Sequence, residues 1–451
     1  MSTNIQKNQI TEGIIWRQLL LFFFPILLGT FFQQLYNTID SVIVGQFVGK
    51  EALAAVGGSS AQIVAFVVGF FTGLSSGASV TIAQFFGAKD SRSANKGLHT
   101  AYAIAAFGGL ILTVSGIILT PFLLEMMNTP ADIVADSAVY LRIYFAGIIF
   151  VLIYNMGSAI LRATGDSKRP LYYLIVCCII NIVLDVLFVI VFHMGVMGVA
   201  VATLIAQAVS AVLVTLKLMR SEGILKLSVK QIRFHGSILK MQLKLGLPTG
   251  FEAILFSITN IAIQSAVNTF GTDTTAAWSA YGKLDAIFWM VSTAFGIAIT
   301  TFVGQNYGAG KMDRVRKSTR VCLLMDFIVS AVLVVFLIAA RFLLFRLFTN
   351  DSHVIEIGCD MLVLITPWYI VYVFIEVIAG ALRGVGNVVV PVAITLLGVC
   401  VLRIAWLAAM LKISPTISAI ILSYPVTWVI TALAFIIYYI YITHKTIAGS
   451  S

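Results

Sequence analysis

The sequence is poor in charge: only 11% of its 451 residues are Asp, Glu, Lys or Arg, whereas 60% are hydrophobic. A soluble domain typically carries about 25% charged residues, so a soluble globular protein is excluded. The mean hydropathy of +1.01 indicates a polytopic membrane protein instead. The net charge of +10 does not indicate nucleic-acid binding, because the basic residues lie between apolar stretches, where they anchor loops to one leaflet.

Cysteine and catalytic patterns are also scarce. The five cysteines lie within or at the edge of apolar stretches without metal-ligand spacing to a histidine, which predicts buried, inert thiols. The GDSK segment (165–168) lacks the GxxxxGK[ST] pattern of a phosphate loop, and no Ser-His-Asp or zinc pattern is present. We therefore predict no enzyme activity and no cofactor. The polar N-terminal segment (1–13) lacks the apolar core of a signal peptide, so the first span should be retained.

Twelve apolar segments are each long enough to cross a bilayer, for which about 20 helical residues suffice. A membrane span must satisfy its backbone hydrogen bonds internally, so all of them are predicted to be helices. The sequence therefore predicts an all-α membrane protein with twelve transmembrane helices. The predicted spans are 15–45, 53–85, 97–124, 138–160, 170–192, 196–219, 245–270, 277–305, 319–346, 358–382, 390–411 and 416–443.

Lys and Arg gather in alternate connections between these spans. The 2–3, 4–5 and 8–9 loops and the 6–7 linker are basic, whereas the 3–4 loop contains Glu125, Asp132 and Asp136. The positive-inside rule places the basic side, and with it both termini, in the cytoplasm. We expect a multi-pass protein of the cytoplasmic (plasma) membrane.

The chain repeats itself at a shift of about 221 residues. Three features coincide at nearly this spacing: LRATGDSKRP (161–170) with LRGVGNVVVP (382–391), AQFFGA (83–88) with GQNYGA (304–309), and Pro25 with Pro248. Each repeat holds six spans, an even number, so both halves have the same orientation. We expect two six-helix lobes related by a pseudo-two-fold axis along the membrane normal, with a cavity between them.

The predicted N-lobe comprises residues 1–219 and the C-lobe residues 245–451. The segment 220–244 joins them. Its alternation of apolar and basic residues predicts a cytoplasmic amphipathic helix on the inner leaflet. Glycine-rich stretches such as 69–79 allow close packing between membrane helices.

Pro25 with the following NTIDSVIVGQFVG (37–49), the two LR-x-x-G turns and the two six-span halves resemble the MATE family, for multidrug and toxic compound extrusion. Within it the chain is more similar to the DinF-like branch than to the NorM-like branch, and the resemblance covers nearly the whole chain. It implies ion-driven antiport by alternating access, with export of cationic amphipathic compounds in exchange for H⁺ or Na⁺.

Two acids lie within the apolar spans of the first half. A carboxylate at membrane depth costs roughly 2.5–3.5 kcal/mol, so Asp40 is expected to face an internal cavity. A position in the outer headgroup layer is the alternative. Asp185 lies at a depth that differs by only about 3 Å. Asn181 is one turn from Asp185 on the same face, and Tyr36 is one turn from Asp40.

The resemblance implies that Asp40, Asn181 and Asp185, with Tyr36, form the cation-coupling site. A polar network that only fixes helix packing is the alternative. We hypothesise proton coupling, although Na⁺ could use the same oxygen ligands.

The second half offers candidates for substrate binding or gating. Glu252 and Glu376 lie about one turn nearer the basic side than the acids of the NorM-like pattern, which puts a NorM-type site in doubt. For both glutamates, a solvated charge at the inner mouth is the alternative to a substrate or gating contact. Aromatic faces and adaptable Met side chains suit varied apolar cations, although lipid-facing positions are the alternative. The remaining candidates are Lys283, Asp285, Trp289, Met290 and Tyr372. Asp326 is expected at the interface, and Arg403 needs a partner that the sequence does not identify.

Two other functions compete with drug export. One is a flippase for a lipid-linked sugar, which would have a more cationic cavity than these mostly acidic spans provide. The other is a polytopic membrane enzyme, which would need an interfacial catalytic cluster. The expected partners are cationic amphipathic small molecules and membrane lipid, with no nucleic acid. A monomer suffices because one chain supplies both lobes.

Overall fold

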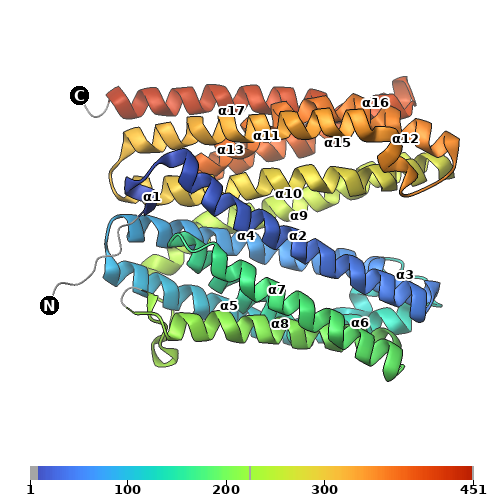
Figure 1. Cartoon of the computed structure of the whole chain (residues 1–451), viewed down its shortest axis with the longest axis horizontal. Helices are drawn as coiled ribbons and strands as arrows, with labels where there is room; N and C mark the ends of the chain where they lie inside the picture. The colour runs from blue at the N-terminus through green and yellow to red at the C-terminus, as the bar shows by residue number, and fades with distance from the viewer. Residues whose placement is uncertain (1–8, 223–224, 449–451) are drawn as a thin grey trace. The chain divides into compact units, whose positions relative to one another are not determined.

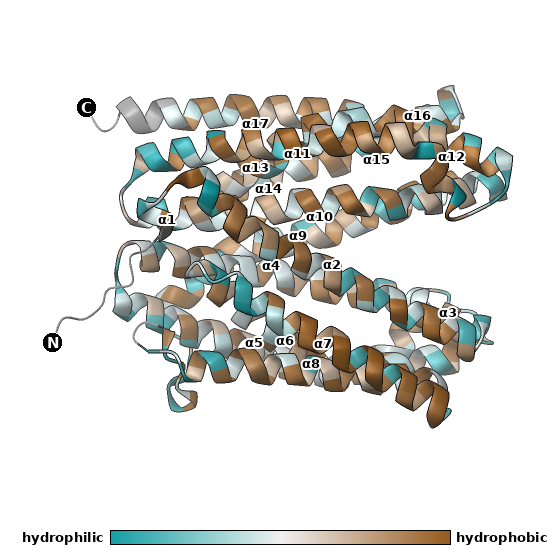
Figure 2. Cartoon of the chain, viewed as in Figure 1, coloured by the Kyte–Doolittle hydropathy of each residue, from teal (hydrophilic) through white to brown (hydrophobic). Residues whose placement is uncertain are grey.

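The computed structural model describes residues 9–222 and 225–448, in which every regular element is a helix. Twelve helical segments of this described part are long and apolar enough to cross a membrane, which confirms the predicted all-α class. Hydrophobic residues cover the middle of these helices, and hydrophilic residues gather towards their ends (Figure 2). Both termini, whose side of the membrane the sequence predicts, lie outside the described residues.

The first repeat contains helices of 18 to 36 residues with short connecting elements (Figure 1). Its elements are α1 (Gln9–Glu12), α2 (Ile15–Phe47), α3 (Lys50–Gly57), α4 (Ser59–Gly87), α5 (Ser91–Met126), α6 (Val134–Ala163), α7 (Lys168–Asp185), the π-helix η1 (Val186–Val191), α8 (Gly195–Met219) and the 3₁₀ turn η3 (Val229–Gln231).

The second repeat has the same plan with more interruptions. Its elements are α9 (Gly236–Asn268), α10 (Thr272–Gly308), α11 (Met312–Arg346), α12 (Ser352–Ile365), the 3₁₀ turn η4 (Thr366–Trp368), α13 (Tyr369–Gly384), α14 (Val389–Thr395), the π-helix η5 (Leu396–Val401), α15 (Leu402–Ile413), α16 (Ile417–Ile421) and α17 (Ser423–Ala448).

The chain forms two compact units, which we call the N-unit (22–251) and the C-unit (1–21 with 252–451). The division falls inside α2 and α9 rather than in the linker between the predicted lobes. In both helices it lies close to an internal proline, Pro25 or Pro248. Proline removes one backbone hydrogen bond and clashes with the preceding turn, so a helix is weakest there.

The predicted amphipathic helix over 220–244 is wrong. The described linker residues are irregular apart from η3, and α9 already begins at Gly236. The linker backbone is satisfied by α5 instead: the N–H of Ser228 donates to His99 Nε2 at 3.0 Å, and Asn95 Nδ2 donates to the carbonyl of Lys226 at 3.2 Å. Because side chains of another helix meet these backbone groups, an internal helical ladder is not needed there.

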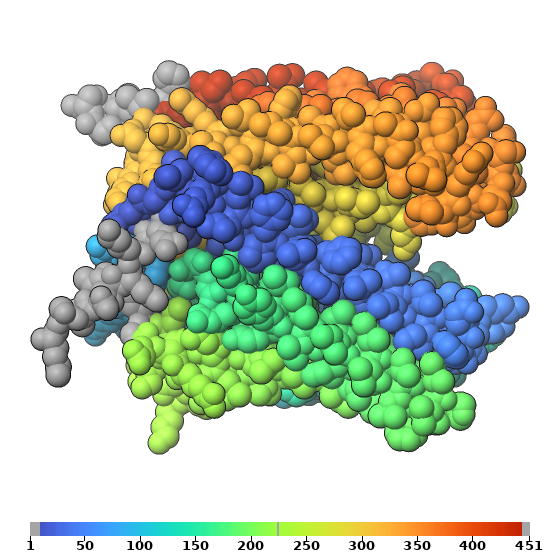
Figure 3. Space-filling model, viewed as in Figure 1, coloured from blue at the N-terminus to red at the C-terminus, as the bar shows by residue number. Residues whose placement is uncertain are grey.

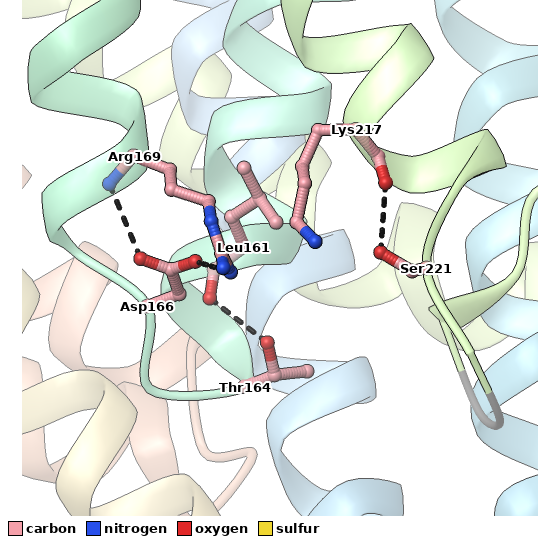
Figure 4. Close-up of polar contacts among 6 residues, drawn as sticks. All are labelled: Leu161, Thr164, Asp166, Arg169, Lys217 and Ser221. Carbon is pink, nitrogen blue, oxygen red and sulfur yellow. Dashed lines mark hydrogen bonds and ion pairs between the residues drawn. The ribbon is translucent and has the colours of Figure 1, made fainter.

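The two LR-x-x-G turns have the same backbone conformation. Gly165 and Gly386 have φ angles of +95° and +88°, which favour glycine, and each N–H donates to the carbonyl three residues earlier at 2.9 Å. In the first turn, Asp166 accepts from the Arg169 side chain at 2.6 Å (Figure 4). This shared geometry supports the repeat predicted from the sequence.

Small residues set the helix packing within the N-unit, where α6 contacts α4, α5 and α8. A Cβ atom added to Gly77 of α4 would overlap the backbone of Gln242 and Gly246 in α9, and one added to Gly73 would overlap Gly250. The predicted role of the 69–79 glycines in close packing is confirmed. Within the C-unit, α10 contacts α11, α12 and α13, and α13 contacts α17.

Candidate functional site

The N-unit holds a buried polar pocket between α2, α7 and α8. The Asp40 carboxyl lies within hydrogen-bonding range of Asp185, and Asn181 and Thr203 are its other side-chain partners. Asp40 is 8% exposed, Asn181 1% and Asp185 0%. The structure therefore brings together the two acids and the amide that the sequence selected. Thr203, which contacts Asn181 at 3.5 Å, was missed because a lone threonine in an apolar span carries no distinctive signal.

This pocket has more acceptors than donors. Asp40 Oδ1, both Asp185 oxygens and Asn181 Oδ1 are buried, and no donor from the described residues reaches them. Two carboxylates that face each other cannot hydrogen bond unless one of them carries a proton. Such a cluster of buried acceptors is costly unless a proton or a cation joins it. The pocket can therefore bind one positive species, and the atoms that would contact that species are carboxyl, amide and hydroxyl oxygens.

The two acids come from neighbouring helices, Asp40 from α2 and Asp185 from α7, which lie side by side in Figure 3. An added Cβ at Gly29 of α2 would be 3.8 Å from Leu174 of α7. Asp185 is the last residue of α7, directly before the π-helix η1. A π-helical turn frees carbonyls from the regular ladder and is frequent at functional sites.

Tyrosines surround the pocket. Tyr36 accepts a hydrogen bond from Gln207 Nε2 at 3.3 Å, and Tyr140 lies near both carboxyl groups. Tyr140 stacks on Tyr144 with ring centroids 6.2 Å apart. Tyr36 was expected here, whereas Gln207 and the two α6 tyrosines were not, because their spacing in α6 and α8 is that of ordinary helix-packing residues.

The C-unit places Asp285 of α10 among aromatic donors. Trp289 Nε1 donates to Asp285 Oδ2 at 2.7 Å, and the hydroxyls of Tyr281 and Tyr369 both donate to Asp285 Oδ1. Lys283 is exposed, so the two residues of the GKLD segment point to different environments, as their i,i+2 spacing predicts. Asp285 and Trp289 are thus brought together, and Lys283 is not.

A second polar cluster of the C-unit lies around Arg383. Arg383 Nη2 pairs with Glu376 Oε1 at 2.9 Å, and Glu252 is the other acid that acts on this guanidinium. Tyr372 lies near both glutamates, and its ring packs edge-on against Trp289 at 4.7 Å. The structure therefore joins Glu252, Glu376 and Tyr372 around one cation. Met290, the neighbour of Trp289, is half-buried.

Asp326 packs inside the protein, and its expected interfacial depth in the membrane stays a prediction. Asp326 is fully buried and accepts from Ser330 Oγ at 3.1 Å. The helix α11 begins at Met312, several residues before the predicted span, so Asp326 lies about 21 Å along it.

Arg403 is 2% exposed and has no carboxylate within ion-pair distance in the described part of the chain. Its guanidinium donates to Thr427 Oγ1 at 2.9 Å and lies 4.0 Å from the centroid of the Tyr424 ring. Hydrogen bonding and cation–π contact therefore supply the partner that the sequence could not identify.

Comparison with known proteins decides the family. The family model described as MatE matches this chain twice, at residues 25–187 and 248–407, so that each match begins at a helix-internal proline. The chain belongs to the MatE family. It is therefore a multi-pass membrane transporter and not an enzyme.

Relatives of this MatE protein carry multidrug names. It is 30% identical over 393 residues to the probable multidrug resistance protein YoeA of Bacillus subtilis (strain 168), covering 85% of this chain and 84% of the relative. It is 30% identical over 400 residues to the probable multidrug resistance protein YpnP of the same organism, covering 88% and 89%.

Solved structures show the same fold. A crystal structure of MATE in the bent conformation superposes with a TM-score of 0.91 at 20% identity, covering 100% of both chains. An outward-facing multidrug resistance MATE family transporter of the MOP superfamily matches with a TM-score of 0.90 at 20% identity, covering 97% of this chain and 98% of the other. The assignment to the DinF-like branch stays a prediction.

Proposed function

We propose that this MatE protein exports cationic amphipathic drugs or toxins in exchange for protons. The observation that carries the proposal is the pair of buried, mutually facing carboxyl groups of Asp40 and Asp185. Asp40 Oδ1 and both Asp185 oxygens have no donor from the described residues. The multidrug names of its relatives support the cargo class. No bound group other than the coupling ion is required.

The coupling follows from the charge of this pocket. A proton shared between the two carboxyl groups removes one negative charge and supplies the missing hydrogen-bond donor. The loss of that proton restores the negative charge, which favours a cationic cargo. Proton and cargo then bind with opposite preference, and this differential binding is all that linkage between them requires.

Sodium is the alternative coupling ion. Carboxylate, amide and hydroxyl oxygens would also hold a hard cation, so the donor set alone fits both ions. Carboxyl oxygens within hydrogen-bonding range of each other favour the proton, because a shared proton fits between them without further ligands.

Cargo contacts in the C-unit are proposed for the aromatic and acidic groups described above. Trp289 and Tyr372 pack edge-on against each other, and Glu252 and Glu376 are the two acids beside Arg383. Lys283, Asp285 and Met290 are further candidates for substrate contact or gating. We also propose a monomer in the plasma membrane with both termini in the cytoplasm, following the basic loops.

Transport in proteoliposomes tests the proposal. Wild-type protein should exchange ethidium when a pH gradient is imposed, and Asp40→Asn or Asp185→Asn should abolish exchange at normal protein level. Asp132→Asn, which changes an exposed acid in the loop between α5 and α6, is the matched control and should keep wild-type exchange. A sodium gradient without a pH gradient separates the two ions. Undiminished efflux by Asp40→Asn under either gradient would remove the pocket from the mechanism.

A further inference from the structure

A cavity of about 420 Å³ opens within the N-unit between the end of α4, the start of α5 and the start of α9. It lies at the end of the unit that carries the basic linker. Its volume is at the small end of the roughly 300–1,000 Å³ range of small-molecule sites. Its lining residues are Phe85, Ser93, Lys96, His235, Gly236, Ser237, Ile238 and Met241.

The polar lining of this cavity is cationic or neutral. Lys96 contributes an ammonium group, and Ser93 and Ser237 contribute hydroxyls. Acidic residues are absent from the lining. Asp90, the acid nearest in sequence, is the N-cap of α5. It accepts from the backbone N–H of Ser93 at 3.0 Å and from the Ser93 side chain, and these bonds lower its pKa. Because Asp90 engages Ser93, the Lys96 ammonium and the Ser237 hydroxyl are the lining groups that remain for an anionic ligand.

Hydrogen bonds around His235 hold a second cation, the Arg233 guanidinium, next to the cavity lining. The imidazole Nδ1 lies 3.1 Å from Thr100 Oγ1, and Nε2 accepts from Arg233 Nε at 3.4 Å. Since Nε2 acts as an acceptor, the ring is neutral. Burial, followed by the charges of Arg233 and Lys96, lowers the pKa of His235, which agrees with this assignment. Among the described residues no carboxylate pairs with Lys96 or Arg233.

The rim of the cavity continues onto an apolar, lipid-facing surface. Phe234, next to His235, packs edge-on against Phe107 of α5 with ring centroids 5.9 Å apart. The Phe107 ring is exposed on the spanning helix α5, and Phe234 and Val229 are exposed in the linker. A ligand with a small anionic head in the cavity could therefore lay an acyl chain along these rings.

We propose that this cavity binds the phosphate headgroup of an anionic phospholipid from the leaflet on the linker side. Lys96 and Ser237 recognise the phosphate, Arg233 adds positive charge from beside His235, and Phe234 and Phe107 contact the chain. Free phosphate shares the headgroup chemistry but not the apolar contact. The bound lipid ties the linker and the first half of α9 to α5. This inference goes beyond the proposed function, because it involves neither the coupling ion nor the exported cargo.

Lipid titration of the purified full chain tests the proposal. Protein in neutral detergent is titrated with short-chain phosphatidylglycerol, with phosphatidylcholine or with inorganic phosphate, and the dissociation constant is taken from the rise in melting temperature. We expect phosphatidylglycerol to bind most tightly. Lys96→Gln should weaken it by roughly fivefold, the effect of one basic residue near an anionic lipid. Lys96→Arg should keep the binding.

Lys230→Gln is the matched control, because it removes one exposed charge from the same linker without touching the cavity. It should bind phosphatidylglycerol like the wild type. Equal binding by Lys96→Gln and Lys230→Gln would overturn the site, and so would equal stabilisation by phosphatidylcholine. If inorganic phosphate matched phosphatidylglycerol, the lipid source would be wrong. A loss in Lys96→Arg as large as in Lys96→Gln would show a packing role instead. The readout is binding, so it is independent of the transport result.

Discussion

Buried charges in this protein are compensated in three different ways. Asp285 accepts from three aromatic donors, Arg403 donates to a hydroxyl over an aromatic ring, and Arg383 pairs with Glu376. The sequence predicted that such residues lie in or near spans, because hydropathy and position suffice for that. It could not predict the partners, because they come from helices far apart in the chain, such as α13 for Asp285.

The Arg383–Glu376 pair offers a prediction at this scale. Arg383→Gln leaves Glu376 and Glu252 without their shared cation. The side chains of Arg383 and Glu376 are only 15% and 20% exposed. Breaking a fully buried pair costs about 3–5 kcal/mol, and we expect roughly 1–3 kcal/mol here because some solvent reaches the pair. A lower melting temperature of the purified variant would show this.

The double variant Arg383→Gln with Glu376→Gln is the control for that experiment. It removes one uncompensated charge and should recover part of the lost stability. If Glu376→Gln destabilised the Arg383→Gln variant as much as it destabilises the wild type, the assigned pairing would be contradicted.

Single elements divide into those that hydropathy predicts and those that tertiary contacts decide. The twelve spans belong to the first kind, since a bilayer leaves only helices as spanning structures. The linker belongs to the second kind: its apolar and basic alternation suits an amphipathic helix, yet α5 side chains bind its backbone and hold it irregular. The early start of α11 also escaped prediction, because Lys and Arg lie in its first turns, before the apolar run.

The packing of α4 against α9 yields an element-scale prediction. Gly77→Ala forces its new Cβ into the backbone of Gln242 and Gly246, so the two helices must separate. Contact through small residues is a main source of helix association in membranes, and we expect a clear drop in melting temperature. Gly282→Ala is the matched control within a helix, because nothing lies within 4 Å of its Cβ.

Gly282→Ala should be neutral or slightly stabilising, by up to about 1 kcal/mol, since alanine favours the helix over glycine. Equal melting temperatures for Gly77→Ala and Gly282→Ala would show that the α4–α9 contact tolerates an extra methyl group. That result would contradict the close packing described here.

At the scale of the whole molecule, the repeat predicted two halves, and the MatE model matches the chain twice at the corresponding positions. The sequence did not predict where the compact units divide. Counting spans places the boundary in the linker, whereas packing places residues 9–21 with the C-unit and the first half of α9 with the N-unit. Arg314 shows why residues 9–21 belong to the C-unit, because its guanidinium donates to the carbonyls of Ile10 and Gly13.

The candidate site was predictable because three of its polar groups stand out in apolar spans. Asp40, Asn181 and Asp185 were selected from the sequence and family resemblance, and the structure brings them together. The rest of the pocket was not predictable, because Thr203, Gln207 and Tyr140 are common in membrane helices and only their spatial convergence distinguishes them.

Proton release on cargo binding tests the central claim most directly. Purified protein in weakly buffered solution is mixed with ethidium, and the released protons are followed with a pH indicator. Wild-type protein should release protons as the cation binds, because cargo and proton favour opposite charge states of the Asp40–Asp185 pocket. Asp40→Asn should release none, whereas Asp132→Asn should match the wild type. The same proton release from Asp40→Asn as from the wild type would contradict the account.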